Sequence, residues 1–208
     1  PGGCDIGARP IDIHIMAFKK LGIDVKEESG YIRCRANQIV GTELNLDFPS
    51  VGATENIILA TVLAEGTTII NNAAMEPEIV NVASFLINMG VRIRGAGTKR
   101  IEIEGNYDLD RGVVDVFPDR IESGTYIIMG ALLGKNLKIK GIIREHIEAL
   151  LIKLNEIGVK YKIDNDVMTI SKCDNLKAIN LKTLVFPGFP TDLQQPLTTL
   201  LTQAKGKS

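Results

Sequence analysis

Residues 78–94 read EIVNVASFLINMGVRIR, and this stretch changes from a helical to a strand pattern at Gly90. Before Gly90, apolar side chains recur at the three- and four-residue spacing of one helix face. These side chains are Ile79, Val82, Phe85 and Leu86. After Gly90, apolar and charged residues alternate, which is typical of a strand with one buried face. A glycine directly after a periodic helix favours the left-handed conformation that ends helices. The stretch therefore predicts a helix over 78–89, a glycine stop and a strand.

This pattern recurs along the chain with a regular period. Gly22, Gly90 and Gly158 lie 68 residues apart, and each leads from a helical pattern into two strand patterns separated by a turn. The strands are predicted at 23–26 and 31–34, at 91–94 and 100–103, and at 159–163 and 167–170. The helix before Gly158 is predicted over 145–157, with Ile147, Leu150, Leu151 and Leu154 on one face. A fixed period of this kind indicates a repeated supersecondary unit.

A second marker, Phe-Pro followed by Ser, Asp or Thr, opens the other helix of each repeat. It stands at 48–50, 117–119 and 189–191, with apolar helical stretches at 57–64, 126–133 and 197–201 and strand patterns at 67–70 and 137–140. One unit therefore reads helix, strand, helix, strand, strand, which is an α/β fold. We expect the back half of one unit, two whole units and the front of a fourth. The native protein is then expected to extend in both directions, as the start at Pro1 without methionine also suggests.

Composition excludes several classes of protein. The 208 residues are 45% hydrophobic and 24% charged, and the formal net charge is −1. The charges are interspersed and form no basic stripe with aromatic residues, which argues against nucleic-acid binding. The longest apolar runs, 57–64 and 126–133, are much shorter than the roughly 20 residues of a membrane-spanning helix. Three widely separated cysteines favour a reducing, cytoplasmic setting.

The first ten residues read PGGCDIGARP, and three glycines and two prolines indicate a loop. A thiol at Cys4 would be exposed there, and Arg9 could lie close enough to favour the thiolate. The alternative is an incidental exposed cysteine in a flexible leader. Cys34 falls within a predicted strand and Cys173 just after another, so both are interpreted as structural or incidental.

Two helix starts carry candidate binding groups. Ser50, Val51 and Gly52 begin a predicted helix, where free N–H groups and the helix dipole favour phosphate. The alternative is that Ser50 is only an N-cap, since Asp119 and Thr191 occupy the matching positions and capping explains all three. Asp192 lies beside the third start, where it would stabilise the helix by default and act as a general base only if it faced a cleft.

The chain offers no sequence signal for a metal or a cofactor. His14 and His146 have no ligand-type partner four residues on, so solvated or capping roles are favoured over metal binding. Motifs for nucleotide phosphate loops, dinucleotides or nucleophile elbows are absent from the sequence. We therefore expect no cofactor.

Six stretches together resemble the UDP-N-acetylglucosamine 1-carboxyvinyltransferase family. The loop 1–12 is similar to the cysteine loop of that family almost residue for residue. The other stretches are 50–54, 64–70, 76–80, 119–125 and 189–194. The resemblance follows the whole chain in order, with only small length changes.

The resemblance implies transfer of an enolpyruvyl group from phosphoenolpyruvate to the 3-hydroxyl of UDP-N-acetylglucosamine, the first committed step of peptidoglycan synthesis. It implies addition and then elimination, through a tetrahedral phospholactoyl intermediate. Cys4 would donate a proton to the methylene of phosphoenolpyruvate and would be the thiol that fosfomycin alkylates. An ordinary thiol pKa near 8.5 suits a proton donor at neutral pH. Asp192 would face the sugar hydroxyl as the base.

The resemblance also implies a binding residue set. Arg9 would contact phosphate or the uridine end of the substrate, and Ser50, Val51 and Gly52 would hold the diphosphate. The uracil site would be lined by Pro10, Ile11, Asp12 and Ile13. The family often has a basic residue where this chain has Phe48, which puts a side-chain contact to the nucleotide there in doubt.

The family fold implies two inside-out, barrel-like α/β domains, each of three βαβαββ units, with substrates in the cleft between them. Residues 1–117 would end the first domain and 118–208 would open the second, with a hinge near 118–119. Further substrate-binding residues of the family would lie beyond both ends, so we expect this chain alone to be inactive. The oligomeric state is left open.

Two alternatives remain. A shikimate-pathway enolpyruvyl transferase would share the fold and the chemistry, but that relative does not use the cysteine found at position 4. A non-catalytic repeat module, using its sheet faces or edges for assembly, would bind no nucleotide and would have three equally reactive cysteines.

Overall fold

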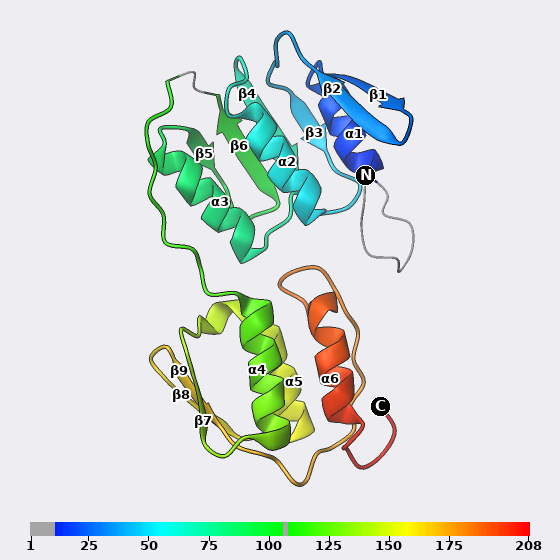
Figure 1. The fold of residues 1–208 in the computed structure, drawn as a ribbon, viewed down its shortest axis with the longest axis vertical. Coiled ribbons are helices and arrows are strands. Elements are labelled where there is room, and N and C mark those ends of the chain that lie inside the picture. The colour runs from blue at the N-terminus through cyan, green and yellow to red at the C-terminus, as the bar shows by residue number, and fades with distance from the viewer. Residues whose placement is uncertain (1–10, 106–107) are drawn as a thin grey trace. The chain divides into compact units, whose positions relative to one another are not determined.

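The structure is a computed structural model that describes residues 11–105 and 108–208. The chain forms two compact units, Pro1–Val116 and Phe117–Ser208, and their helices and strands are labelled in Figure 1. The α/β fold class is confirmed. The assignment of 1–117 and 118–208 to two larger domains, with a hinge near 118–119, stays a prediction.

The first unit contains the one repeat in which all six elements are described. It begins with α1 (Asp12–Lys20) and the hairpin of β1 (Asp24–Glu28) and β2 (Tyr31–Arg35). The βαβαββ repeat follows as β3 (Glu43–Asn45), α2 (Val51–Thr61), β4 (Thr67–Asn71), α3 (Pro77–Asn88), β5 (Arg92–Arg94) and β6 (Arg100–Glu104). Its sheet has the order β3-β4-β6-β5, in which β3 and β4 are parallel and the other pairs are antiparallel.

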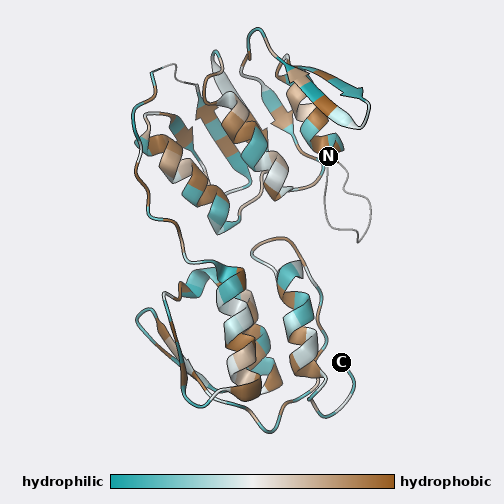
Figure 2. Cartoon of the chain, in the orientation of Figure 1, coloured by the Kyte–Doolittle hydropathy of each residue, from teal (hydrophilic) through white to brown (hydrophobic). Residues whose placement is uncertain are grey.

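The alternation seen in the sequence separates the two faces of this sheet. Ile70, Ile101 and Ile103 are fully buried beneath α2 and α3, which lie on the same side of the sheet in Figure 1. The other face is charged, and Arg92 pairs there with Glu104 at 2.9 Å, in the register of β5 and β6. Figure 2 shows the resulting mixture of hydrophobic and hydrophilic residues along each strand.

The second unit repeats the pattern with fewer strands. It contains α4 (Arg120–Leu133), β7 (Leu137–Lys140), a 3₁₀ turn η1 (Arg144–His146), α5 (Glu148–Ile157), β8 (Tyr161–Asp164), β9 (Val167–Ile170), a 3₁₀ turn η2 (Thr191–Leu193) and α6 (Gln194–Leu201). The sheet has the order β7-β9-β8 and is antiparallel throughout. Residues 108–119 form no strand, so no counterpart of β3 precedes α4 among the described residues.

The front of a further repeat is recognisable by its hydrogen bonds. In the first unit, Glu65 N donates to Ile39 O at 2.9 Å and Gly41 N donates to Glu65 O at 2.8 Å. In the second unit, Lys205 N donates to Leu176 O at 3.0 Å and Ala178 N donates to Lys205 O at 3.3 Å. The two sets have the same pattern, and each accompanies an isolated parallel bridge, Val40 with Glu65 and Lys177 with Lys205.

The outward face of the second sheet carries lysine on both outer strands. Lys138 and Lys140 belong to β7 and Lys162 belongs to β8, and all three are exposed. Between them, β9 has the uncharged sequence VMTI. Lys138 and Lys162 lie in register on either side of Thr169.

The glycine stops predicted from the period are confirmed. Gly22, Gly90 and Gly158 have φ values of 83°, 99° and 93°, in the left-handed region. Gly158 caps α5, and its N–H donates to Leu154 O and Asn155 O at 3.1 Å.

Two local predictions were wrong. The helix predicted over 145–157 begins at Glu148, because Ile147 leaves the helical region at φ −116° and the residues before it form η1. The hairpin of β1 and β2 does not bury one face, since only Val25 and Ile32 are half-buried. Of the helices, only α1 packs substantially against β1.

We expect Gly158→Ala to destabilise the chain by about 1–2 kcal/mol, because a Cβ is unfavourable in the left-handed region. Gly158→Asn should cost less, since asparagine enters this region more readily. Urea-unfolding midpoints of the two variants and the wild type measure the difference, and equal midpoints for all three would contradict the expectation.

Candidate functional site

The residues predicted to carry function fall in separate parts of the chain. Cys4, Arg9 and Pro10 lie outside the described residues. Ile11, Asp12, Ile13, Ser50, Val51 and Gly52 belong to the first unit, and Asp192 belongs to the second. Within the first unit, the structure brings the start of α1 and the start of α2 together.

The start of α2 is built by Ser50. Its backbone is extended at φ −79° and ψ 123°, and its Oγ accepts a hydrogen bond from Ala53 N at 3.3 Å. Thr54, which is fully buried, donates from Oγ1 to Ser50 O and accepts from Ala74 N. Ser50 is therefore an N-cap. The N–H groups of Val51 and Gly52 belong to the first turn, where no carbonyl group of the helix can pair with them. Those two groups suit an anion by their position in the first turn.

His14 of α1 stands next to this helix start. A Cβ at Gly52 would lie 3.4 Å from His14 Cε1 and 3.8 Å from Nε2, so the glycine admits the imidazole against α2. Asn56 Nδ2 lies 2.9 Å from His14 Nδ1. An amide nitrogen only donates, so Nδ1 is the acceptor of this hydrogen bond. Sequence reasoning gave His14 a solvated or capping role, and its neighbours Gly52 and Asn56 are about 40 residues away in the chain.

The predicted uracil residues have mixed surroundings. Asp12 is exposed in the first turn of α1, where its charge also suits the helix dipole. Ile13 and Val51 pack partly against the core of the first unit, and Ile11 is half-buried. The side chains of Ile13 and Val51 therefore support the fold, which leaves their main-chain groups as the polar atoms for a ligand.

Asp192 lies in the short turn η2 and is exposed. The prediction that Thr191 caps its helix as Ser50 does was wrong, because no side chain caps η2 or α6. At the matching position in the second unit, Asp119 does cap α4, with Oδ1 accepting from Ile121 N at 2.7 Å and Glu122 N at 3.2 Å. In η2 a 3₁₀ turn precedes the helix, and Leu193 at its end is buried.

The described part of the chain shows no group of three or more metal-ligating side chains. The ring of His146 stacks at a tilt against Phe117, with centroids 5.4 Å apart. Cys34 and Cys173 are free thiols, exposed and half-buried respectively. None of the described helices is long and apolar enough to cross a membrane.

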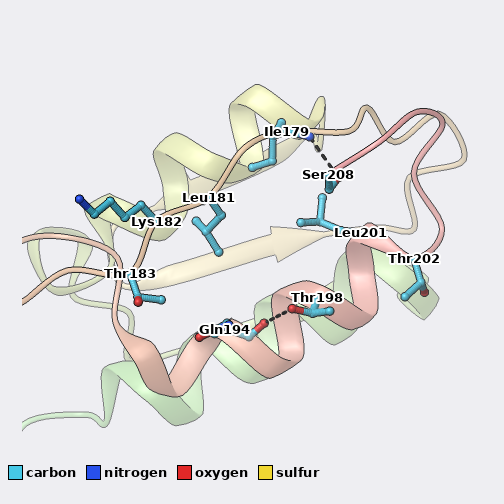
Figure 3. A pocket seen from close by; sticks show the side chains of 9 residues that line it. All are labelled: Ile179, Leu181, Lys182, Thr183, Gln194, Thr198, Leu201, Thr202 and Ser208. Carbon is cyan, nitrogen blue, oxygen red and sulfur yellow. Dashed lines mark hydrogen bonds between the residues drawn. The ribbon is translucent and has the colours of Figure 1, made fainter.

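A cavity of about 610 Å³ opens in the second unit (Figure 3). Its lining consists of Ile179, Leu181, Lys182, Thr183, Gln194, Thr198, Leu201, Thr202 and Ser208. Apart from Lys182, it contains no charged side chain, and Ile179 N donates to Ser208 Oγ at 3.3 Å at one end. Asp192 is not part of this lining.

The whole chain, residues 1–208, matches the sequence profile of a family described as EPSP synthase (3-phosphoshikimate 1-carboxyvinyltransferase). It is 48% identical over 208 residues to UDP-N-acetylglucosamine 1-carboxyvinyltransferase 1 of Caldanaerobacter subterraneus subsp. tengcongensis, covering 100% of this chain and 50% of the relative. It is 52% identical over 209 residues to UDP-N-acetylglucosamine 1-carboxyvinyltransferase 2 of Bacillus subtilis, covering 100% and 49%. The chain thus spans about half the length of the curated relatives it matches.

Solved structures share the fold at lower identity. The enolpyruvyl transferase NikO from Streptomyces tendae superposes with a TM-score of 0.86 and 24% identity, over 96% of this chain and 50% of that protein. An EPSP synthase from Acinetobacter baumannii gives a TM-score of 0.58 and 20% identity, over 97% and 47%. At these identities the likeness establishes the fold.

One carboxyl group near the helix starts of the first unit has a shifted pKa. Burial raises the pKa of Glu55 above its usual range, and the nearby charge of Glu78 raises it further. Glu55 follows Thr54 on α2, and Glu78 lies in the first turn of α3.

We expect Glu55→Gln to stabilise the chain near pH 7 and to make no difference below about pH 4. A raised pKa in the folded state means that folding favours the protonated carboxyl, and this contribution is lost as the pH rises through the folded value. The gain should stay below about 1 kcal/mol, because Glu55 is only partly buried and its charge is screened. Urea unfolding at pH 4 and pH 7 measures it, with the exposed Glu27→Gln as control. A gain that is the same at both pH values would contradict the assignment.

Proposed function

The chain belongs to the EPSP synthase (3-phosphoshikimate 1-carboxyvinyltransferase) family, and on that premise we propose that it is part of an enzyme that transfers an enolpyruvyl group from phosphoenolpyruvate to the 3-hydroxyl of UDP-N-acetylglucosamine. The observation that carries this proposal is identity of about 50% over the whole chain to relatives with that acceptor in their names. Since the chain spans about half of those relatives, the activity belongs to the longer protein.

The alternative acceptor is shikimate 3-phosphate, as the name of the family suggests. Two observations favour the nucleotide sugar. The solved EPSP synthases are only 20% identical to this chain. The chain also has a cysteine in its glycine-rich segment 1–10, which fits the UDP-N-acetylglucosamine branch. A non-catalytic repeat module is disfavoured because the similarity extends through the loop and helix starts as well as the core.

The proposed chemistry divides proton transfer between two residues. Asp192 accepts the proton of the sugar 3-hydroxyl while the oxygen of that hydroxyl attacks C2 of phosphoenolpyruvate. Cys4 gives a proton to the methylene carbon. In the tetrahedral adduct, loss of a methyl proton and departure of phosphate then restore the double bond. An exposed carboxylate in a fixed turn suits the role of base, provided that the substrate hydroxyl comes within hydrogen-bond distance.

The start of α2 is the proposed diphosphate site. The N–H groups of Val51 and Gly52 point away from the helix body and favour negative charge there. His14 adds an imidazole next to Gly52, in a chain whose Phe48 supplies no charge at this end of the helix. Arg9, Pro10, Ile11, Asp12 and Ile13 are proposed to hold the uridine end.

The longer protein is further proposed to catalyse the first committed step of peptidoglycan synthesis. With this role, the protein would act in the cytoplasm and in cell-wall biogenesis. It would thereby contribute to cell shape and to cell division in the cell cycle. It would also make the protein a target of fosfomycin through Cys4.

Ligand binding by the intact enzyme tests the acceptor. Isothermal titration should detect UDP-N-acetylglucosamine and not shikimate 3-phosphate. Gly52→Val should weaken the nucleotide at least tenfold, because a branched side chain would meet the His14 ring and cover the N–H groups. Leu59→Val is a suitable control, since it also places a branched side chain on α2 but at an exposed position. Preferential binding of shikimate 3-phosphate would refute the proposal.

Mass-spectrometric mapping after fosfomycin treatment tests the role of Cys4 in the same enzyme. Cys4 should be modified, and UDP-N-acetylglucosamine should change its rate, while Cys34 and Cys173 stay unmodified. Equal labelling of all three cysteines would favour the non-catalytic module.

A further inference from the structure

The segment 119–125 is one of three stretches of the family resemblance to which the proposed chemistry gives no role. It forms the N-cap and first turns of α4. Arg120 contacts the loop that leads to Asp192, and Gly124 lies against Leu193, the residue after it; both partners are far away in the sequence. We propose that Arg120 and Gly124 are positioning residues that fix the place of the Asp192 turn. This inference rests on the proposed function of Asp192.

Gly124 provides the first contact. It is buried on α4, and a Cβ there would lie 2.5 Å from Leu193 Cδ1 and 2.9 Å from Leu193 Cδ2. Leu193 is only 2% exposed and directly follows Asp192 in η2. The absence of a side chain at 124 therefore sets how closely the turn carrying Asp192 packs on α4. Any side chain at position 124 has to displace the Cδ atoms of Leu193. Because Leu193 is buried and is bonded to Asp192 through the main chain, this displacement is passed on to the Asp192 turn.

Arg120 provides the second contact, one turn earlier on the same helix. Its guanidinium carbon lies 5.6 Å from the centroid of the Phe186 ring, within the range of a cation–π interaction. Phe186 belongs to a loop that closes on itself, with Leu184 N donating to Phe189 O at 2.9 Å and Gly188 N donating to Val185 O at 2.8 Å. That loop continues through the buried Phe189 into η2. The loop before Asp192 and the residue after it are thus both held by α4.

The same helix supplies a matched control. Gly130 is also buried on α4, and a Cβ there would lie 2.5 Å from Ile170 Cγ2 and 3.1 Å from Leu137 Cδ2. Gly124 and Gly130 thus differ in which neighbour they admit. Gly124 faces the turn of Asp192, whereas Gly130 faces the sheet. Alanine at either position raises helix propensity equally and creates a clash of the same size.

The experiment measures kcat and KM of the intact enzyme with phosphoenolpyruvate and UDP-N-acetylglucosamine. Gly124→Ala should lower kcat about 10- to 100-fold, because a displacement of about 1 Å of a reacting group has effects of this size. The KM for either substrate should change by less than about threefold. Gly130→Ala should retain kcat within about threefold at a similar loss of thermal stability. Equal effects of the two variants on kcat would overturn the proposal.

A compensating change separates positioning from general damage. Leu193→Val removes the two Cδ atoms that a Cβ at 124 would meet, so the double variant Gly124→Ala/Leu193→Val should recover most of the lost kcat. The double variant Gly130→Ala/Leu193→Val should be no faster than Gly130→Ala alone. If the first double variant is no faster than Gly124→Ala alone, the proposal is wrong.

Two more variants keep the outcome decisive. Should Gly124→Ala not fold, Arg120→Lys tests the second contact. Lysine keeps the charge but lacks the planar guanidinium group that lies over the Phe186 ring. It should lower kcat several-fold with KM unchanged, and an unchanged kcat would count against the proposal. Asp192→Asn tests the premise separately: if it keeps wild-type kcat, the proposed base is wrong, whatever the variants of α4 show.

Discussion

The four-stranded and the three-stranded sheet each have one apolar face that must be covered by helices of the same unit, and the other features of the structure depend on this burial. Ile70, Ile101 and Ile103 in the first unit, and Met168 and Ile170 in the second, are at most 1% exposed under their helices. At about 25 cal/mol per Å² of apolar area, such side chains dominate the stability of each unit. The helices are therefore held firmly along their length, and their first turns, where main-chain N–H groups are free, become fixed points in space. Candidate functional residues lie at two such places, Ser50 to Gly52 at the start of α2 and Asp192 at the entry to α6.

The same packing gives the starts of α2 and α4 different neighbours. Ser50 and Asp119 both cap their helices, so capping alone does not distinguish a binding site from an ordinary helix end. The difference lies in the neighbours. At α2 a glycine in the first turn admits the His14 imidazole, and the N–H groups of Val51 and Gly52 have no carbonyl partner within the helix. At α4 the first turn faces Phe186 and supports a loop. The same repeated element is thus flanked by a polar imidazole in one copy and by an aromatic loop residue in another.

The sequence predicted the fold better than the site, for a physical reason. The helix and strand periods and the glycine stops depend on neighbours in the chain, so the strands at 137–140 and 167–170 were predicted at their observed ends. Local patterns failed where another segment decides the outcome: the hairpin of β1 and β2 alternates in sequence but is mostly exposed, and Ile147 interrupts a helix that its periodicity would continue. Contacts such as His14 with Asn56, or Gly124 with Leu193, join residues 42 and 69 positions apart. Such long-range contacts cannot be predicted from the periodicity of the sequence. The family resemblance supplied the roles of Cys4 and Asp192, which spacing alone left open.

The lysines on the second sheet have a consequence of their own. Strands β7 and β8 are the two edges of that sheet, and an exposed edge offers unpaired main-chain groups to any other extended chain. Lys138 and Lys140 on β7 would bring like charges together if two copies met along that edge. Strand β8 carries Lys162 together with the exposed Asp164, and the uncharged central strand VMTI lies between the two edges. The charged side chains that keep this face exposed to water therefore also disfavour edge-to-edge pairing of two copies.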